Sequence, residues 1–171
     1  MSNIYHARLM FARPSIDGVD FALNGRVLHG KVGLEALPRL LELWPNLRGN
    51  VSYSVHGRRD GERLLLQLEM VGECHLQCQR CLGGMVYPVA WVQVLRLVPV
   101  EQIEMIDSND ELDCIEASYA MDLLAMVEDE LLLGLPFAPR HPEGECAEQA
   151  IEFKRAVSPF AELANLDNKR Q

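Results

Sequence analysis

The chain has 171 residues, of which 49% are hydrophobic and 24% are charged. This composition is typical of a globular protein and excludes wholesale disorder. No apolar run approaches the roughly 20 residues that cross a bilayer, and the first residues lack the apolar core of a signal peptide. We therefore expect a cytoplasmic protein that forms a single domain over residues 1–171 and has no membrane partner.

Charge is distributed unevenly along the chain. The 16 basic and 25 acidic residues give a net charge of −9, yet no Lys or Arg occurs from Leu97 to Pro139. The simplest interpretation of this acidic stretch is a solvated loop. The alternative is an arm for a basic protein, since a strongly acidic segment repels nucleic acid, and we expect no binding to DNA. Residues 101–111 are predicted to be a mobile acidic linker, with these candidate partner-binding acids: Glu104, Asp107, Asp110 and Glu111.

The first third of the chain predicts a short strand and a helix. Phe21, Leu23 and Val27 are typical of a strand broken by Asn24-Gly25. From Gly33 to Trp44 the apolar residues recur at helical spacing, which predicts one helix. A proline at position 38 fits only the first turn of such a helix.

Alternating apolar residues dominate the centre of the sequence. Residues 50–55 and 64–70 repeat with period two on either side of a Gly-containing turn, and this pattern predicts an antiparallel hairpin. A further buried strand is expected from about Val86. Leu112 to Tyr119 is predicted to return as a strand.

A second helix is predicted over Leu123 to Leu133, with Asp122 as its N-cap and Gly134 at its end. On a helical wheel Glu130 falls within the apolar arc, so we expect it to be a structural acid that is paired in the fold. Residues 147–171 lack a strong pattern and are predicted to be a loosely packed tail. The predicted fold class is α+β: an antiparallel sheet with a long hairpin, packed by two helices.

Five cysteines, an odd number, and the absence of a secretory signal argue against a disulfide framework. Cys78 and Cys81 form a CxxC pair followed by two glycines, and this spacing favours a zinc knuckle. His141 and Cys146 are the candidates for the other two ligands, with Cys74 as a further candidate. The predicted cofactor is one structural zinc. Reduced, partly buried thiols are the alternative interpretation, and redox use is a third.

Four arginines at or near the hairpin are candidates for contacts with RNA phosphates: Arg58, Arg59, Arg63 and Arg80. Tyr53 and Trp91 are candidates for base stacking on a face of the sheet. A solvated turn is the alternative interpretation. No phosphate loop, metalloprotease motif or nucleophile elbow is present, so we predict that the protein is not an enzyme.

Three stretches together resemble the YceD family of large-ribosomal-subunit RNA accumulation proteins. They are the cysteine motif at Leu76 to Leu82, the acidic helix that ends in Leu135-Pro136, and the segment that contains His141 and Cys146. The resemblance implies that the cysteine and histidine positions are characteristic of the family. Many relatives have two cysteines in the second half, where this chain has His141 and Cys146, which leaves a Cys3His site.

The resemblance also implies a non-catalytic role in the synthesis, processing or accumulation of 23S ribosomal RNA. The implied partner is precursor 23S RNA or a pre-50S particle, reached directly or through a ribosomal protein or a processing nuclease. Two hypotheses follow. In the first, the arginines contact RNA while zinc holds the knuckle. In the second, the protein is an adaptor whose acidic segment binds a basic ribosomal protein or nuclease.

Overall fold

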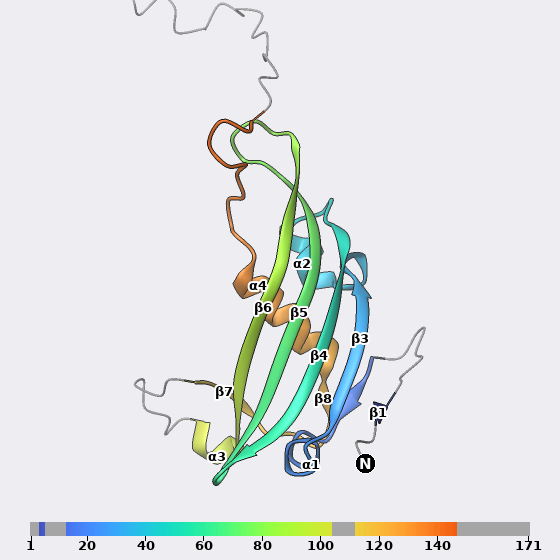
Figure 1. Cartoon of the computed structure of the whole chain (residues 1–171), viewed down its shortest axis with the longest axis vertical. Coiled ribbons are helices and arrows are strands. Elements are labelled where there is room, and N and C mark those ends of the chain that lie inside the picture. The colour runs from blue at the N-terminus through green and yellow to red at the C-terminus, as the bar shows by residue number, and fades with distance from the viewer. Residues whose placement is uncertain (1–3, 6–12, 104–111, 147–171) are drawn as a thin grey trace, which may run out of the picture.

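Three long strands form the body of the protein in this computed structural model, which describes residues 4–5, 13–103 and 112–146 (Figure 1). Their bounds are β4 (Arg48–Asp60), β5 (Arg63–Gln77) and β6 (Gly84–Val98). β4 and most of β5 alternate buried and more exposed residues, as a sheet with one buried face requires, whereas β6 carries apolar residues on both faces.

The main sheet has six strands in the order β1-β3-β4-β5-β6-β7. β3 (Val27–Gly33), β4, β5 and β6 are antiparallel neighbours, whereas β1 (Ile4–Tyr5) and β7 (Asp113–Glu116) pair in parallel at the two edges. β2 (Ser15–Ile16) and β8 (Met121–Asp122) form a separate two-stranded sheet. The predicted α+β class is confirmed.

The predicted hairpin is confirmed and is longer than its sequence pattern indicated. β4 and β5 pair without interruption from Arg48 opposite His75 to Asp60 opposite Arg63. The turn between them places Gly61 at a φ of 59°, a left-handed conformation that glycine adopts without strain.

The second predicted helix is also confirmed, as α4 (Leu123–Gly134). The Asp122 carboxylate accepts hydrogen bonds from the backbone N–H groups of Leu124 and Ala125 at 2.9 and 3.0 Å. These bonds satisfy donors that the first helical turn leaves free, so Asp122 is the N-cap that its position predicted.

Two predictions in the first third were wrong. Phe21 and Leu23 belong to a helix, α1 (Gly18–Leu23), because the Asp17 carboxylate caps the N–H of Asp20 and starts the helix there. The predicted helix over residues 33–44 is divided into a 3-10 turn, η1 (Leu34–Ala36), and α2 (Pro38–Leu43). Leu37 is extended between them, as the residue before a proline tends to be.

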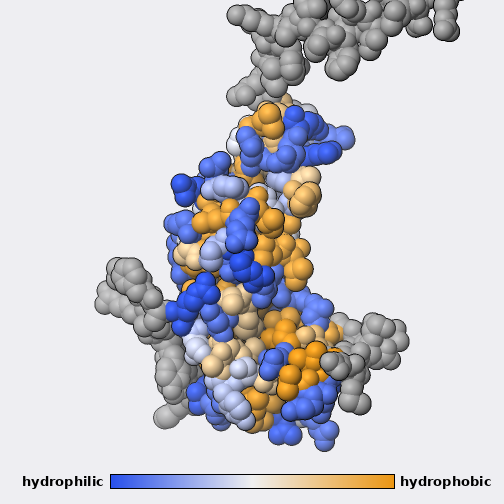
Figure 2. Space-filling view, turned by 180° about the vertical axis from the view of Figure 1, so that it is seen from behind, coloured by the Kyte–Doolittle hydropathy of each residue, from blue (hydrophilic) through white to orange (hydrophobic). Residues whose placement is uncertain are grey.

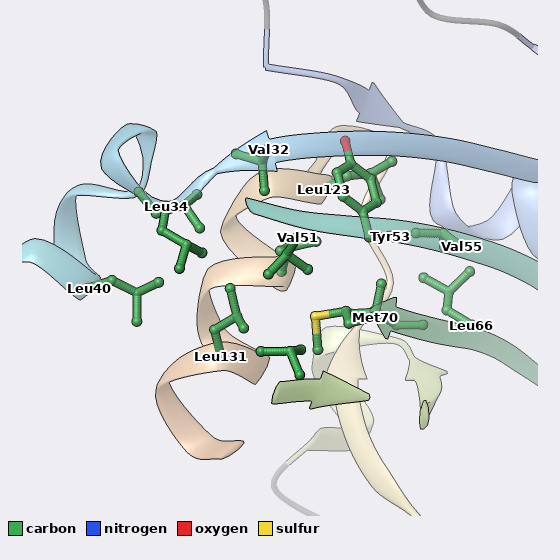
Figure 3. Close-up of a cluster of buried hydrophobic side chains, with 14 of the residues drawn as sticks. Val32, Leu34, Leu40, Val51, Tyr53, Val55, Leu66, Met70, Leu123 and Leu131 are labelled. Carbon is green, nitrogen blue, oxygen red and sulfur yellow. The ribbon is translucent and has the colours of Figure 1, made fainter. Parts of the chain in front are cut away.

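The helices α2 and α4 cover one face of the main sheet, and the core lies between them and the sheet (Figure 3). Leu123, Val127 and Leu131 of α4 are fully buried against apolar side chains of β4 and β5. The opposite face carries the alternate residues of the same strands, and no helix of the described residues covers it (Figure 1). We call it the open face.

A fourth helix, α3 (Val100–Ile103), follows β6 and begins the predicted acidic linker. Residues 104–111 of that linker and the predicted tail at 147–171 lie outside the described residues. Among the helices described, none has the length and hydropathy that a transmembrane span needs. Figure 2 views the molecule from the α4 side and shows hydrophilic side chains interleaved with exposed hydrophobic ones.

Candidate metal centre

The CxxC pair lies in the tight turn between β5 and β6. The Cys78 N–H donates to the Gly83 carbonyl, and the Leu82 N–H donates to the Cys78 carbonyl, both at 2.9 Å. These bonds fold residues 78–83 into a knuckle. Leu82, rather than either following glycine, takes the left-handed conformation at a φ of 58°. Gly83 leaves room beside the knuckle, because a Cβ atom there would be 3.4 Å from the Cys81 sulfur.

The second half of the centre arrives from the end of α4. From the end of α4 the chain runs beside β6 to the knuckle at the far end of the sheet (Figure 1). There the Gln79 N–H donates to the Pro139 carbonyl at 2.8 Å, which fixes the segment against the knuckle. Two segments about sixty residues apart in the sequence are thereby brought together.

The structure gathers all four predicted ligands. The three thiol sulfurs and a ring nitrogen of His141 lie within 4.8 Å of one another, from the residues Cys78, Cys81, His141 and Cys146. The Sγ atoms of Cys78 and Cys146 are 3.9 Å apart, and His141 Nδ1 is 3.4 Å from the Cys81 Sγ. Zinc–sulfur bonds of about 2.3 Å in a tetrahedron place two sulfurs about 3.8 Å apart. The donor set and its spacing therefore fit a four-coordinate zinc ion.

The imidazole of His141 is oriented for ligation through Nδ1. Its Nε2 lies 3.2 Å from the carbonyl oxygen of Gly84, which can only accept a hydrogen bond. A proton on Nε2 leaves the Nδ1 lone pair directed at the three sulfurs. A histidine ligand held by a carbonyl at its other nitrogen is the usual arrangement in metal sites.

Hydrogen-bond donors around the sulfurs favour thiolates. Burial alone would raise the pKa of Cys78, but the N–H groups of Cys81, His141 and Arg80 outweigh it and lower that pKa to about 5. Burial also opposes ionisation of Cys146, yet Arg80 and His141 lower its pKa. The pKa of Cys81 is raised instead: the Gly83 N–H lowers it, but burial and the neighbouring sulfurs of Cys146 and Cys78 outweigh that bond. Two of the three sulfurs are therefore prepared as thiolates, the form in which cysteine binds metal.

Arg80 is part of this centre, which the sequence did not indicate. Its Nε donates to the Cys146 sulfur at 2.9 Å, and its terminal nitrogen donates to the carbonyls of His141 and Pro142 at 3.2 and 3.0 Å. A Cys3His site with a divalent ion carries one net negative charge, which the guanidinium offsets. The proximity of Arg80 to Cys78 and Cys81 in the sequence was the only available signal.

The other two cysteines lie elsewhere. Cys74 is fully buried in the core, where burial raises its pKa to about 11. It is not in the ligand cluster, so its candidacy as a further ligand was wrong. Cys114 is half-buried in β7, within the strand that the sequence predicted.

The structure does not bring the four candidate RNA-binding arginines together. Arg58, Arg59 and Arg63 lie at the β4–β5 turn, whereas Arg80 lies in the knuckle at the opposite end of β5 (Figure 1). At about 3.3 Å per residue, β5 separates the two groups by about 45 Å. Contact between these arginines and RNA stays a prediction.

The proposed stacking residues are not available to bases. Tyr53 is 6% exposed and faces the core, and the ring of Trp91 packs against the end of α4 at Gly134. The stacking prediction was wrong because the odd-numbered residues of β4 and β6 point towards α4 and not towards the open face.

The helical wheel placed the wrong acid of α4 in the core. Glu128 is 1% exposed, whereas Glu130 is only half-buried. The Glu128 carboxylate accepts hydrogen bonds from the N–H groups of Arg39 and Leu40 at 2.6 and 3.2 Å, and so caps the start of α2. For Glu130, burial raises the pKa, and the nearby Asp113 and Asp129 raise it further.

The predicted partner-binding acids Glu104, Asp107, Asp110 and Glu111 lie outside the described residues, so the structure adds nothing to that prediction.

An α+β sheet protein with a knuckle-type Cys3His cluster is the class that these features define. The sequence model of the family described as large ribosomal RNA subunit accumulation protein YceD matches residues 66–167, and the chain belongs to this family. A curated relative, the large ribosomal RNA subunit accumulation protein YceD of Haemophilus influenzae (strain ATCC 51907 / DSM 11121 / KW20 / Rd), is 29% identical over 153 residues. That alignment covers 82% of this chain and 87% of the relative. No solved structure matches the chain.

Proposed function

We propose that the protein is a non-catalytic factor of large-subunit biogenesis that promotes accumulation of 23S ribosomal RNA. Family membership is the observation that carries this proposal, since the relative's name states a role in ribosomal RNA accumulation and no reaction. The partner would be precursor 23S RNA or a pre-50S particle. A structural zinc ion in the cluster of Cys78, Cys81, His141 and Cys146 would hold the knuckle closed.

The open face of the sheet supports contact with RNA. The register of β3, β4 and β5 places four exposed cations on this face, and they are Lys31, Arg48, Arg58 and Arg63. The same face also carries three acids, Asp60, Glu69 and Glu73. The acids of α4 and β7 lie on the helix side or at the edge. A phosphate backbone would therefore approach the open face rather than the helices. Arg59 differs from its neighbours, because its position in β4 directs it to the helix side, where its Nε donates to the Gly61 carbonyl at 2.6 Å.

Binding of a labelled precursor 23S transcript at several salt concentrations tests the proposal. Substitution of Arg58 and Arg63 by Ala should weaken binding about tenfold and lower the salt slope by about two, since each phosphate contact contributes about 0.9 to it. The matched control is Arg13→Ala/Arg39→Ala, which removes two cations that pair with Asp122 and Asp129 near α4. Among the three hairpin arginines, Arg59 should matter least, so Arg59→Ala should weaken binding of the transcript less than the other substitutions.

An equal loss of affinity in the control would mean that only net charge matters. Unchanged binding by the Arg58/Arg63 variant would remove the open face from the RNA interface. Metal analysis of the untagged protein tests the zinc separately, with about one ion per chain expected.

A further inference from the structure

The outer edge of β6 receives few backbone hydrogen bonds from the described residues. Residues 135–141 run beside this edge from the end of α4 to the knuckle (Figure 1), but none of their backbone groups bonds to it. β6 pairs with β5 from Gly84 to Leu97, but β7 reaches its other side only from Leu95 to Val98 (Figure 1). At the knuckle end the free stretch stops at Gly84, whose carbonyl contacts His141. The described residues supply no backbone hydrogen bond to this side of Val86, Ala90 or Val92.

The pattern of the sheet shows which backbone groups face this edge. The Ala117 N–H donates to the Val98 carbonyl at 2.8 Å, so Val98 directs its backbone groups away from β5. Because a strand repeats every two residues, Val92, Ala90 and Val86 do the same. Pro88 also faces away from β5, so the N–H that proline lacks removes no hydrogen bond to β5. Strands tolerate proline at such outward-facing edge positions. Within the described residues, the backbone groups along this edge have no backbone partner, and the row of N–H donors is interrupted at Pro88.

Exposed apolar side chains lie beside the unpaired edge of β6. Val86 and Val92 are each 55% exposed on the open face. On the other side, Leu133 and Phe137 are 80% and 88% exposed on either side of Leu135 at the end of α4. This end of α4 lies at β6, because a Cβ atom at Gly134 would be 2.7 Å from the Trp91 ring. Exposed apolar groups beside an unpaired strand are typical of a surface that a partner covers.

The charges beside the edge indicate what that partner is. β7 and α4 flank β6, and both come from the stretch of sequence that contains no Lys or Arg. The Gln93 side chain at this edge donates to the Asp113 carboxylate at 2.7 Å, and Asp113 in turn lies near enough to Glu130 to influence its ionisation. A second copy of the chain would bring only the same acids, and no cation from β7 or α4, to this edge. A strand that carries Lys or Arg would be attracted.

We propose that the β6 edge binds an extended, basic segment of a partner protein, which joins the sheet as an additional strand. Its backbone pairs with Val86, Ala90 and Val92. Its alternate residues divide between the two faces: apolar side chains lie beside the valines on the open face, and Lys or Arg side chains lie towards Asp113 and Glu130. Such strand addition takes affinity from the backbone bonds and specificity from the alternating side chains. The proposal does not depend on RNA binding and would stand if that failed.

Amide hydrogen exchange measured by NMR on the full chain tests this proposal. The probe is a short synthetic peptide that alternates Lys with Val and Thr. In the free protein the amides of Val86, Ala90 and Val92 should exchange quickly, while those of Val89 and Trp91, bonded to β5, exchange slowly. Saturating peptide should slow exchange at the first three at least tenfold.

Two controls separate strand addition from simple charge attraction. The same peptide N-methylated at every second residue keeps its charges but loses the edge that pairs, and it should give no protection. In the protein, Ala90→Pro removes one outward N–H and should weaken binding at least tenfold, whereas Ala90→Ser keeps that N–H and should bind normally. Because the methylated peptide is tested on the unaltered protein, the proposal stays testable even if Ala90→Pro does not fold.

Several outcomes would overturn it. Equal binding of the methylated peptide, or of a peptide with Glu in place of Lys, would show that no strand is added or that basic charge is not recognised. Protection of the three amides in the free protein at every concentration would mean that the chain's own residues cover the edge. Protection that rises with protein concentration alone would indicate a second copy, and equal protection by an oligouridine would indicate RNA.

Discussion

The middle of the sheet and its knuckle end are held together by different interactions. In the middle, α4 presses fully buried leucines and valines against β4 and β5, and the cohesion is apolar. At the knuckle, Leu82 is 58% exposed, and the contacts join three sulfurs, an imidazole and the Arg80 guanidinium. A turn and a loop from distant parts of the sequence meet there without an apolar core of their own.

This difference separates what stabilises each region. Apolar burial in the middle contributes regardless of ligand. At the knuckle, thiolates placed 3.9 Å apart repel one another unless a cation lies between them. Metal binding and local folding are therefore expected to be coupled at the knuckle and independent in the middle.

Loss of the metal should have the largest effect and would test this separation directly. Cys78→Ser/Cys81→Ser should reduce zinc from about one ion per chain to none. Amides of residues 78–84 and 139–146 should lose protection from exchange, because structural zinc contributes about 10–16 kcal/mol in isolated fingers. The amides of β4 should stay protected. Metal analysis and hydrogen exchange on the same samples provide the measurement.

Cys114→Ser is the matched control, since it removes a thiol from β7 outside the cluster and should keep the zinc. If the whole protein unfolded with the double variant, the knuckle and the middle of the sheet would be one cooperative unit, and their stabilities would not be independent. If neither protein held metal, the cluster would have to be explained by its hydrogen bonds alone.

The stability of the middle of the sheet also depends on one buried polar residue, Glu128. Glu128→Ala should lower the free energy of unfolding by about 3 kcal/mol, because it leaves the buried N–H groups of Arg39 and Leu40 without an acceptor. Glu128→Gln keeps one acceptor oxygen and should cost about 1 kcal/mol. Urea denaturation of both variants checks the order. Equal losses would show that the carboxylate's charge, and not its role as a cap, is what the fold requires.

Local patterns predicted the elements that local interactions determine. The hairpin follows from period-two alternation, and α4 with its Asp122 cap follows from helical spacing. The two halves of the cysteine cluster were also predicted, because zinc restricts its ligands to few residue types. In each of these cases a short stretch of sequence contains the physical cause.

The errors concern contacts between distant segments. Glu128 is buried because the start of α2 supplies donors to it, and the first of them, the N–H of Arg39, is 89 residues away in the sequence. Arg80 is held by Cys146, 66 residues away. Tyr53 and Trp91 were assigned to an accessible face because the side of the sheet that α4 covers cannot be read from the strands alone. No periodicity in a single segment contains this information.

The smallest expected effect would sharpen the comparison between the two acids of α4. The pKa of Glu130 is raised above 4.5, first by burial and then by Asp113 and Asp129. A carboxyl group with a raised pKa in the folded state favours folding while it is protonated, and that contribution is lost as pH rises through its folded pKa. Glu130→Gln, which stays neutral, should therefore stabilise the protein at pH 7. The gain should be a few tenths of a kcal/mol, since solvent screens this half-buried side chain, and it should vanish as the pH falls below about 4.5.

Thermal melts of the two proteins across this range provide the measurement. In an Asp113→Asn background the gain should shrink, because one of the repelling charges is already gone. A loss of stability at pH 7 would instead show that Glu130 has a favourable partner, as the helical wheel first suggested.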